Sequence, residues 1–228
     1  MLPRSVLQTT MPRRIAPSSL AWLLALCAAP ACAQTADSGW ILQALARPAP
    51  MRTDFVEVRV SPLLKSPLRL SGEYRRPRED TLVREVRAPY RETTTLVSSK
   101  TGPGEARIAR DGKPPRTFSL SRVPELASLQ TGFGALLAGD REQVERVYRL
   151  QAQGDRARWT LTLAPKDKAL AARLRDIVLY GQGAELRCIE TRPVKGDLQR
   201  TLLASAALAV KASTDADALQ ALCRNGVK

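Results

Sequence analysis

One stretch decides the fold of this chain, and it reads Leu68-Arg69-Leu70-Ser71-Gly72-Glu73-Tyr74-Arg75-Arg76-Pro77. In a β-strand, successive side chains point to opposite faces of the sheet, so residues two apart share a face. The even-numbered face carries Leu68, Leu70, Gly72, Tyr74 and Arg76. This alternation predicts a strand with one largely apolar face and one charged face.

A second strand is predicted just before this stretch, because the pattern takes a period of two from Asp54 onward. Phe55 and the charged residues Glu57 and Arg59 fall on one of its faces. Two strands in succession predict an antiparallel meander. Further strands are expected at residues 81–87, 92–98, 106–110, 143–151, 159–165, 174–180, 185–192 and 198–206.

Three helices are predicted around these strands. The first begins at Ser38, a possible cap, and ends before Pro48. The others cover residues 123–137 and 215–224. Together the elements predict an α+β fold, in which helices cover the apolar face of a curved antiparallel sheet. The apolar residues of this face could line a cavity or fill a core, and the pattern alone leaves both interpretations open.

Residues 1–33 have the layout of a secretory signal peptide. Three arginines precede an apolar stretch at residues 20–29, which is too short to cross a bilayer. The small-residue triplet Ala31-Cys32-Ala33 predicts cleavage before Gln34. A lipid-anchored form would need a lipid-attachment motif, which the leader cysteines match poorly. We therefore expect an exported protein with a single mature domain, residues 34–228.

The mature chain is strongly basic. Removing 33 of the 228 residues leaves 195, with 33 basic and 22 acidic residues and a net charge of +11. Such a charge attracts anionic partners, including nucleic acids and anionic lipid surfaces. The basic residues are spread along the chain without the aromatic clusters that stack on bases, so we expect no nucleic acid partner.

Two cysteines, Cys188 and Cys223, follow the leader, and an even number in an oxidising compartment favours a disulfide. Its expected role is to hold the C-terminal helix on the sheet. A redox pair would favour a close Cys-x-x-Cys spacing, which is absent.

The residue types that enzymes and metal sites most often need are missing. The chain has no histidine, which removes the commonest general base and the commonest metal ligand. No nucleophile elbow and no glycine-rich phosphate loop is present. We therefore expect no enzymatic activity, no metal site and no cofactor.

The order of sequence landmarks resembles that of the periplasmic outer-membrane lipoprotein carrier family, LolA and its relatives. The two most specific landmarks are Gly72-x-x-x-Arg76-Pro77 and Trp159-x-Leu161-x-Leu163-x-Pro165. The resemblance covers residues 38–206 and points to a divergent LolA-related branch. It implies a strongly curved, incomplete antiparallel β-barrel, a half-barrel, whose open side is covered by helices and which binds acyl chains inside.

The resemblance also implies roles for individual residues. Arg76 matches the arginine that latches the helical lid of the carrier to backbone carbonyls, a task that suits the five donors of a guanidinium. The residues expected to line the cavity are Tyr74, Leu70, Leu68, Phe55, Leu82, Val86 and Leu96. Arg84 stands where the family commonly has an aromatic residue, and a charge there would change the ligand preference.

By this resemblance, the chain is expected to be a monomeric periplasmic carrier. It would receive lipid acyl chains, aryl polyene chains or lipoprotein acyl chains from an inner-membrane donor complex and pass them to an outer-membrane acceptor. The alternative is a regulatory or sensor module that uses the same fold to bind a protein partner.

Overall fold

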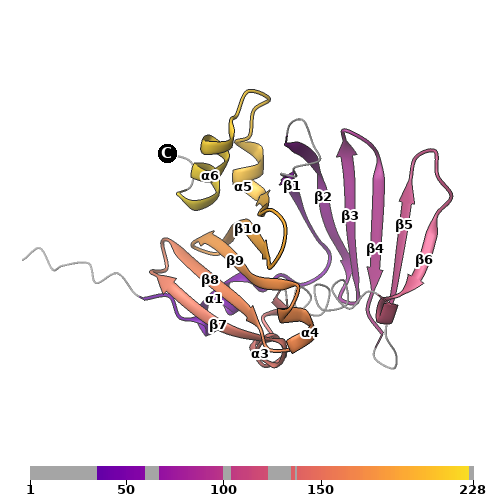
Figure 1. The fold of residues 1–228 in the computed structure, drawn as a ribbon. Coiled ribbons are helices and arrows are strands. Elements are labelled where there is room, and N and C mark those ends of the chain that lie inside the picture. The colour runs from indigo at the N-terminus through magenta and orange to yellow at the C-terminus, as the bar shows by residue number, and fades with distance from the viewer. Residues whose placement is uncertain (1–34, 60–66, 100–103, 123–134, 137, 226–228) are drawn as a thin grey trace, which may run out of the picture. The chain divides into compact units, whose positions relative to one another are not determined.

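The computed structural model describes residues 35–59, 67–99, 104–122, 135–136 and 138–225 (Figure 1). They all belong to one unit, residues 33–228. The predicted leader lies outside the described residues, and so does most of the predicted helix at 123–137. The strands are β1 (Met51–Arg59), β2 (Leu68–Arg78), β3 (Thr81–Ala88), β4 (Glu92–Val97), β5 (Glu105–Arg110), β6 (Arg116–Ser119), β7 (Tyr148–Gly154), β8 (Trp159–Pro165), β9 (Leu174–Gln182), β10 (Glu185–Pro193) and β11 (Gln199–Leu203). The helices are α1 (Ser38–Leu45), η1 (Leu120–Arg122), α3 (Arg141–Val147), α4 (Lys168–Ala171), α5 (Ala204–Leu208) and α6 (Ala216–Arg224).

All these strands form one antiparallel sheet in the order β6-β5-β4-β3-β2-β1-β11-β10-β9-β8-β7. Neighbouring strands are consecutive in the chain except where β1 pairs with β11. Among the described strands, β6 and β7 are the two edges, so the curved sheet stays open (Figure 1). This architecture confirms the predicted α+β fold with a curved, incomplete antiparallel barrel.

The two faces of the sheet carry different helices. We call the face that bears Phe55 and Leu161 the inner face, and the opposite face, which bears Leu202 and Cys188, the outer face. On the inner face, the buried α1 residues Ile41, Leu42 and Leu45 pack with Tyr148, Trp159, Leu161, Leu163 and Leu179. On the outer face, α5 and α6 lie side by side next to β10 (Figure 1).

Cys188 and Cys223 form a disulfide, which joins β10 to α6. Both cysteines are buried in an outer-face cluster with Leu202, Ala206 and Leu219. The predicted pairing is therefore present, and it fixes the C-terminal helix to the sheet as expected.

Three local predictions were wrong. Asp37, not Ser38, caps α1, because its side chain accepts a hydrogen bond from the Trp40 amide. Residues 204–206 do not extend β11, because the chain turns into the alanine-rich helix α5, with φ of 47° at Ala204.

The third wrong prediction concerns residues 143–151, which are not one strand. Their first part belongs to α3, and β7 begins only at Tyr148. Asp140 caps α3 by accepting a hydrogen bond from the Gln143 amide. Ion pairs one turn apart join Arg141 to Glu145 and Glu142 to Arg146, and such pairs favour a helix.

Candidate ligand-binding site on the inner face

A buried apolar cluster lies at the middle of the sheet. Its buried members are Phe55, Leu70, Val86 and Leu203, from four different strands. Register brings them together, since Gly72 of β2 stands opposite Phe55 of β1 and Val86 of β3. We call this set the central cluster.

The central cluster depends on a close approach of two strands at Gly72. A Cβ atom at this position would lie 1.8 Å from the carbonyl oxygen of Glu85. Only glycine lets β2 and β3 come this close, and the register of the pair shifts here between Ser71 and Gly72.

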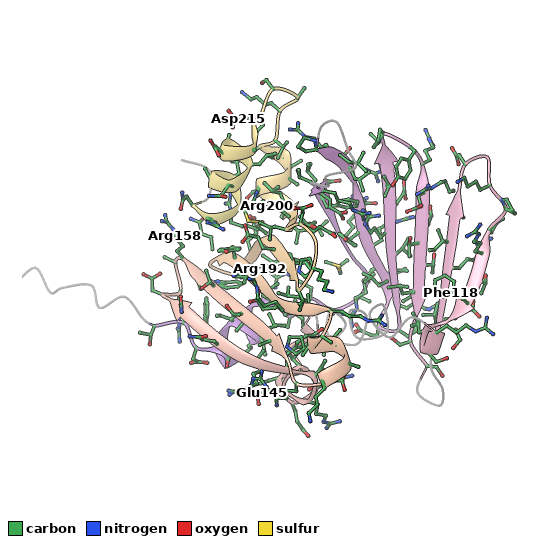
Figure 2. The ribbon with its side chains drawn as sticks, viewed as in Figure 1. Phe118, Glu145, Arg158, Arg192, Arg200 and Asp215 are labelled. Atoms are coloured by element: carbon green, nitrogen blue, oxygen red, sulfur yellow. A yellow bond between two sulfur atoms is a disulfide. The ribbon has the colours of Figure 1, made fainter. Side chains whose placement is uncertain are left out.

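The structure divides the predicted cavity residues between two clusters. Phe55, Leu70 and Val86 are buried in the central cluster, and Leu68 and Tyr74 pack against it half-buried. The ring centroids of Phe55 and Tyr74 are 4.8 Å apart. The remaining two, Leu82 and Leu96, belong to a separate cluster with Ala106, Phe118 and Leu120, toward the β6 edge (Figure 2).

A buried ion pair accompanies the apolar residues on the inner face. The Glu57 carboxylate is 1% exposed and accepts hydrogen bonds from Arg84, at 2.9 Å, and from Arg59. The Arg84 guanidinium also lies 4.8 Å from the centre of the Phe55 ring, a cation–π contact. Burial raises the pKa of the neighbouring Tyr74 hydroxyl, so this group stays protonated at neutral pH. A neutral hydroxyl and a compensated ion pair therefore lie beside the central cluster.

Arg76 is buried, with 4% of its surface exposed, and it reaches the chain that follows α1. Its Nη1 donates a hydrogen bond to the backbone carbonyl of Arg47, at 2.8 Å. Its Nη2 donates a hydrogen bond to the Glu79 carboxylate. The same carboxylate accepts a hydrogen bond from the Ala49 amide, at 2.8 Å. Arg76 and Glu79 thus hold both ends of the segment 47–49.

The Arg47 side chain continues this connection toward the other half of the sheet. It donates to the carbonyl of Ala44 in α1 at 3.0 Å and to the carbonyl of Ala184, between β9 and β10, at 2.9 Å. We call Arg47, Arg76 and Glu79 the clasp, because they join β2, the end of α1 and the β9–β10 turn.

A pocket of about 490 Å³ lies next to the clasp. It is lined by Leu45, Arg47, Met51, Arg52, Thr53, Leu136, Gln182, Ala184, Glu185, Leu186, Leu203 and Ala204. Leu203 belongs to the central cluster and Leu186 packs against it, so the pocket and the cluster are continuous. None of the eight residues proposed from sequence is among the described residues that line this pocket.

Sequence reasoning missed Arg47 and Glu57. A signal existed for Glu57, because the period of two placed it on the same face as Phe55. No signal existed for Arg47, whose contact with Ala184 joins residues 137 positions apart.

The part of the chain that the structure describes contains no group of histidine, cysteine or acidic side chains that could hold a metal ion. It also contains no helix that is long and apolar enough to cross a membrane.

A comparison with curated protein sequences gave no match. Among solved structures, the LolA superfamily protein NE2245 from Nitrosomonas europaea is 11% identical, with a TM-score of 0.36, over 72% of this chain and 89% of that chain. The Pseudomonas aeruginosa MucA/MucB complex matches with 17% identity and a TM-score of 0.33, over 74% of this chain and 56% of that chain. At these scores neither structure supports an argument about function.

The match to a protein family covers nearly the whole chain. A family model described as outer membrane lipoprotein carrier protein LolA-like matches residues 28–226. This confirms the resemblance found in the sequence landmarks, and the chain therefore belongs to the LolA-like family of outer membrane lipoprotein carrier proteins.

Proposed function

We propose that the protein is a periplasmic carrier that binds an acyl chain of a lipid or lipoprotein in the inner-face pocket. It would take this chain from an inner-membrane donor and pass it to an outer-membrane acceptor. One observation carries the proposal: in a member of this family, an apolar pocket of about 490 Å³ opens beside the central cluster.

The size and lining of the pocket suit an acyl chain. Pockets for small ligands have volumes of roughly 300–1,000 Å³ and are mostly apolar. The apolar lining includes Leu45, Met51, Leu186 and Leu203. Each CH₂ group that leaves water for such a lining stabilises the complex by about 0.8 kcal/mol.

The clasp supplies a way to control entry. Arg47 lines the pocket, and its carbonyl is held by Arg76. A ligand that binds better when the clasp is open shifts the population toward the open form by its difference in affinity. The clasp would therefore couple loading and release to a movement at the end of α1.

Displacement of a fluorescent fatty acid tests the proposal. Thr53 is half-buried and lines the pocket, so Thr53→Trp fills it with an indole. Thr117, on the outer face of edge strand β6, is exposed, and Thr117→Trp is the matched control. We expect binding by the wild type and by Thr117→Trp, and a loss of at least tenfold in affinity for Thr53→Trp. If the two variants bind the fatty acid with equal affinity, the acyl chain does not bind in this pocket.

The second candidate is a regulatory module that binds a protein partner. The feature that favours it is the position of β6 at one edge of the described strands, where an extended peptide could add a strand. A stable protein partner that is captured by lipid-free protein, and lost when Thr117 is replaced by proline, would support this function over the carrier.

A further inference from the structure

A second pocket, of about 240 Å³, lies on the inner face near the β6 edge. It is lined by Glu92, Ile108, Arg110, Lys113, Pro114 and Arg116. Register pairs Glu92 with Arg110 and Ile108 with Arg116, so β4, β5 and β6 all contribute. We call it the edge pocket.

The charges of the edge pocket do not cancel. Glu92 is its single carboxylate among the described lining residues, and Arg110 neutralises it through a hydrogen bond of 2.8 Å. The side chains of Lys113 and Arg116 are exposed and form no ion pair or hydrogen bond with any described residue. Asp111 lies in the same turn and lines a neighbouring pocket, to which Glu92, Arg110 and Lys113 also contribute, but it forms no ion pair with Lys113. The positive charges of Lys113 and Arg116 therefore stay uncompensated among the described residues, beside the apolar side chains of Ile108 and Pro114.

The edge pocket is continuous with the central cluster. Along one line of register pairs, Phe55 is followed by Gly72, Val86, Glu92 and Arg110. Tyr90 packs against the central cluster, and the Arg110 guanidinium lies 4.4 Å from the centre of its ring. An aromatic ring thus joins the apolar and the cationic parts of the same face.

The distance between the two parts suits one lipid molecule. Four strand spacings separate β1 from β5, about 19 Å at about 4.8 Å each. One leaflet of a bilayer contributes about half of a hydrocarbon core of about 30 Å, or about 15 Å. An acyl chain whose end contacts Thr53, a β1 residue that lines the inner-face pocket, therefore ends near the edge pocket.

We infer that the edge pocket binds the anionic headgroup of the carried lipid, so the ligand is an amphiphile with a phosphate or carboxylate group. Lys113 and Arg116 donate charge-assisted hydrogen bonds to the anion, and Arg110 orients it while stacked on Tyr90. The inference rests on the proposed carrier function and specifies its ligand class.

Three probes test the inference: a short-chain phosphatidylglycerol, a phosphatidylcholine with the same chains, and inorganic phosphate. The first two share their chains and a phosphodiester group but differ in the headgroup alcohol, so that one headgroup is anionic and the other has no net charge, and the third probe lacks the chains. Titration of the purified protein should give affinity for phosphatidylglycerol at least tenfold above that for phosphatidylcholine. Inorganic phosphate should bind far more weakly than either lipid.

Two double variants test whether the preference for phosphatidylglycerol comes from the edge pocket. Lys113→Ala with Arg116→Ala removes the two free charges of the edge pocket. Arg107→Ala with Arg158→Ala is the control, because it removes two exposed charges that do not line the edge pocket, one on the outer face of β5 and one before β8. We expect the first variant to lose about tenfold in affinity for phosphatidylglycerol and nothing for phosphatidylcholine, and the control to behave as the wild type.

Each contrary result has a distinct meaning. Equal affinity for the two lipids, unchanged in the double variant, overturns the headgroup site and leaves the carrier function intact. If inorganic phosphate binds as tightly as phosphatidylglycerol, the site recognises free phosphate and not the headgroup of a lipid, and the inference is wrong. Binding of neither lipid overturns the inference together with the proposed function.

Discussion

Arg76 donates a hydrogen bond of 2.8 Å to the backbone carbonyl of Arg47, which lies 29 residues earlier in the chain. The bond joins a buried strand residue to the segment that follows α1. The Arg47 side chain in turn donates a hydrogen bond to the β9–β10 turn. The two arginines therefore link β2 to that turn along one side of the pocket. In the proposed carrier, opening of the clasp would break both of these contacts.

Replacing Arg76 by leucine should open the clasp without unfolding the protein. The Glu79 carboxylate then loses the group that holds it, and the Ala49 amide loses a fixed acceptor. We expect hydrogen exchange at Ala49 to become about tenfold faster, the effect of losing roughly 1.5 kcal/mol of protection. The control is Arg75→Leu, on the opposite face, and exchange that stays at the wild-type rate in Arg76→Leu would contradict the clasp.

Gly72→Ala should destabilise the sheet where the central cluster is built. The added Cβ would meet the Glu85 carbonyl, so β2 and β3 must move apart. We expect the free energy of unfolding to fall by about 1–3 kcal/mol, as for other overpacked sites. Urea unfolding measures this loss, with Ser71→Ala as the neighbouring control, and equal stability of the two variants would show that the strands have room.

The disulfide should stabilise the protein mainly through the loop that it closes. A sequence separation of 35 residues corresponds to about 3–4 kcal/mol in the chain-entropy account. Urea unfolding with and without a reductant should show a loss of this size. The variant with both Cys188 and Cys223 replaced by alanine should be as unstable as the reduced wild type and insensitive to reductant.

Glu190 should make stability depend on acid pH. Its carboxylate is 1% exposed and accepts hydrogen bonds from Arg200, at 2.7 Å, from Tyr180, at 3.0 Å, and from Arg224, at 3.3 Å. Burial alone would raise the pKa of Glu190, but the hydrogen bonds from Arg200 and Tyr180 and the charges of Arg200 and Arg224 outweigh it and lower the pKa below 4.5. A carboxyl group with a lowered pKa stabilises the fold above its unfolded pKa and loses this effect as the pH falls through its folded pKa.

Glu190→Gln should remove that dependence. At pH 7 the variant leaves Arg200 without its partner, so we expect it to be about 3 kcal/mol less stable than the wild type. Between pH 6 and pH 3, its free energy of unfolding should fall less than that of the wild type. Glu142→Gln, at an exposed pair on α3, is the control, and an identical pH slope in Glu190→Gln and the wild type would contradict the assignment.

The elements with a clear period were predictable from sequence. The alternation in residues 68–77 identified β2, and the period of two placed Phe55 and Glu57 on one face of β1, as they are in the sheet. Residues 143–151 were not predictable in the same way, because a helix changes into a strand between Val147 and Tyr148 and the apolar residues fit both periods. The helical signals, the Asp140 cap and the pair of Arg141 with Glu145, begin outside that window.

The pocket was harder to predict than the sheet. Its lining combines the end of α1 with the β9–β10 turn and the start of β1, which lie far apart in the chain. Local periodicity indicates which face a residue takes but not which distant segment covers it. The residues proposed from sequence therefore fall in the apolar clusters beside the pocket, and Leu203 and Leu186, which join the two, were not proposed.

Native mass spectrometry tests the central claim most directly. The protein would be purified gently from the periplasm of a cell that exports it, and any bound molecule would be extracted and identified. We predict one lipid per protein, with an anionic headgroup, which is absent from Thr53→Trp and retained by Thr117→Trp. Two results would contradict an acyl-chain carrier that uses this pocket. One is that the wild-type protein carries no lipid, and the other is that Thr53→Trp carries the same lipid as the wild type.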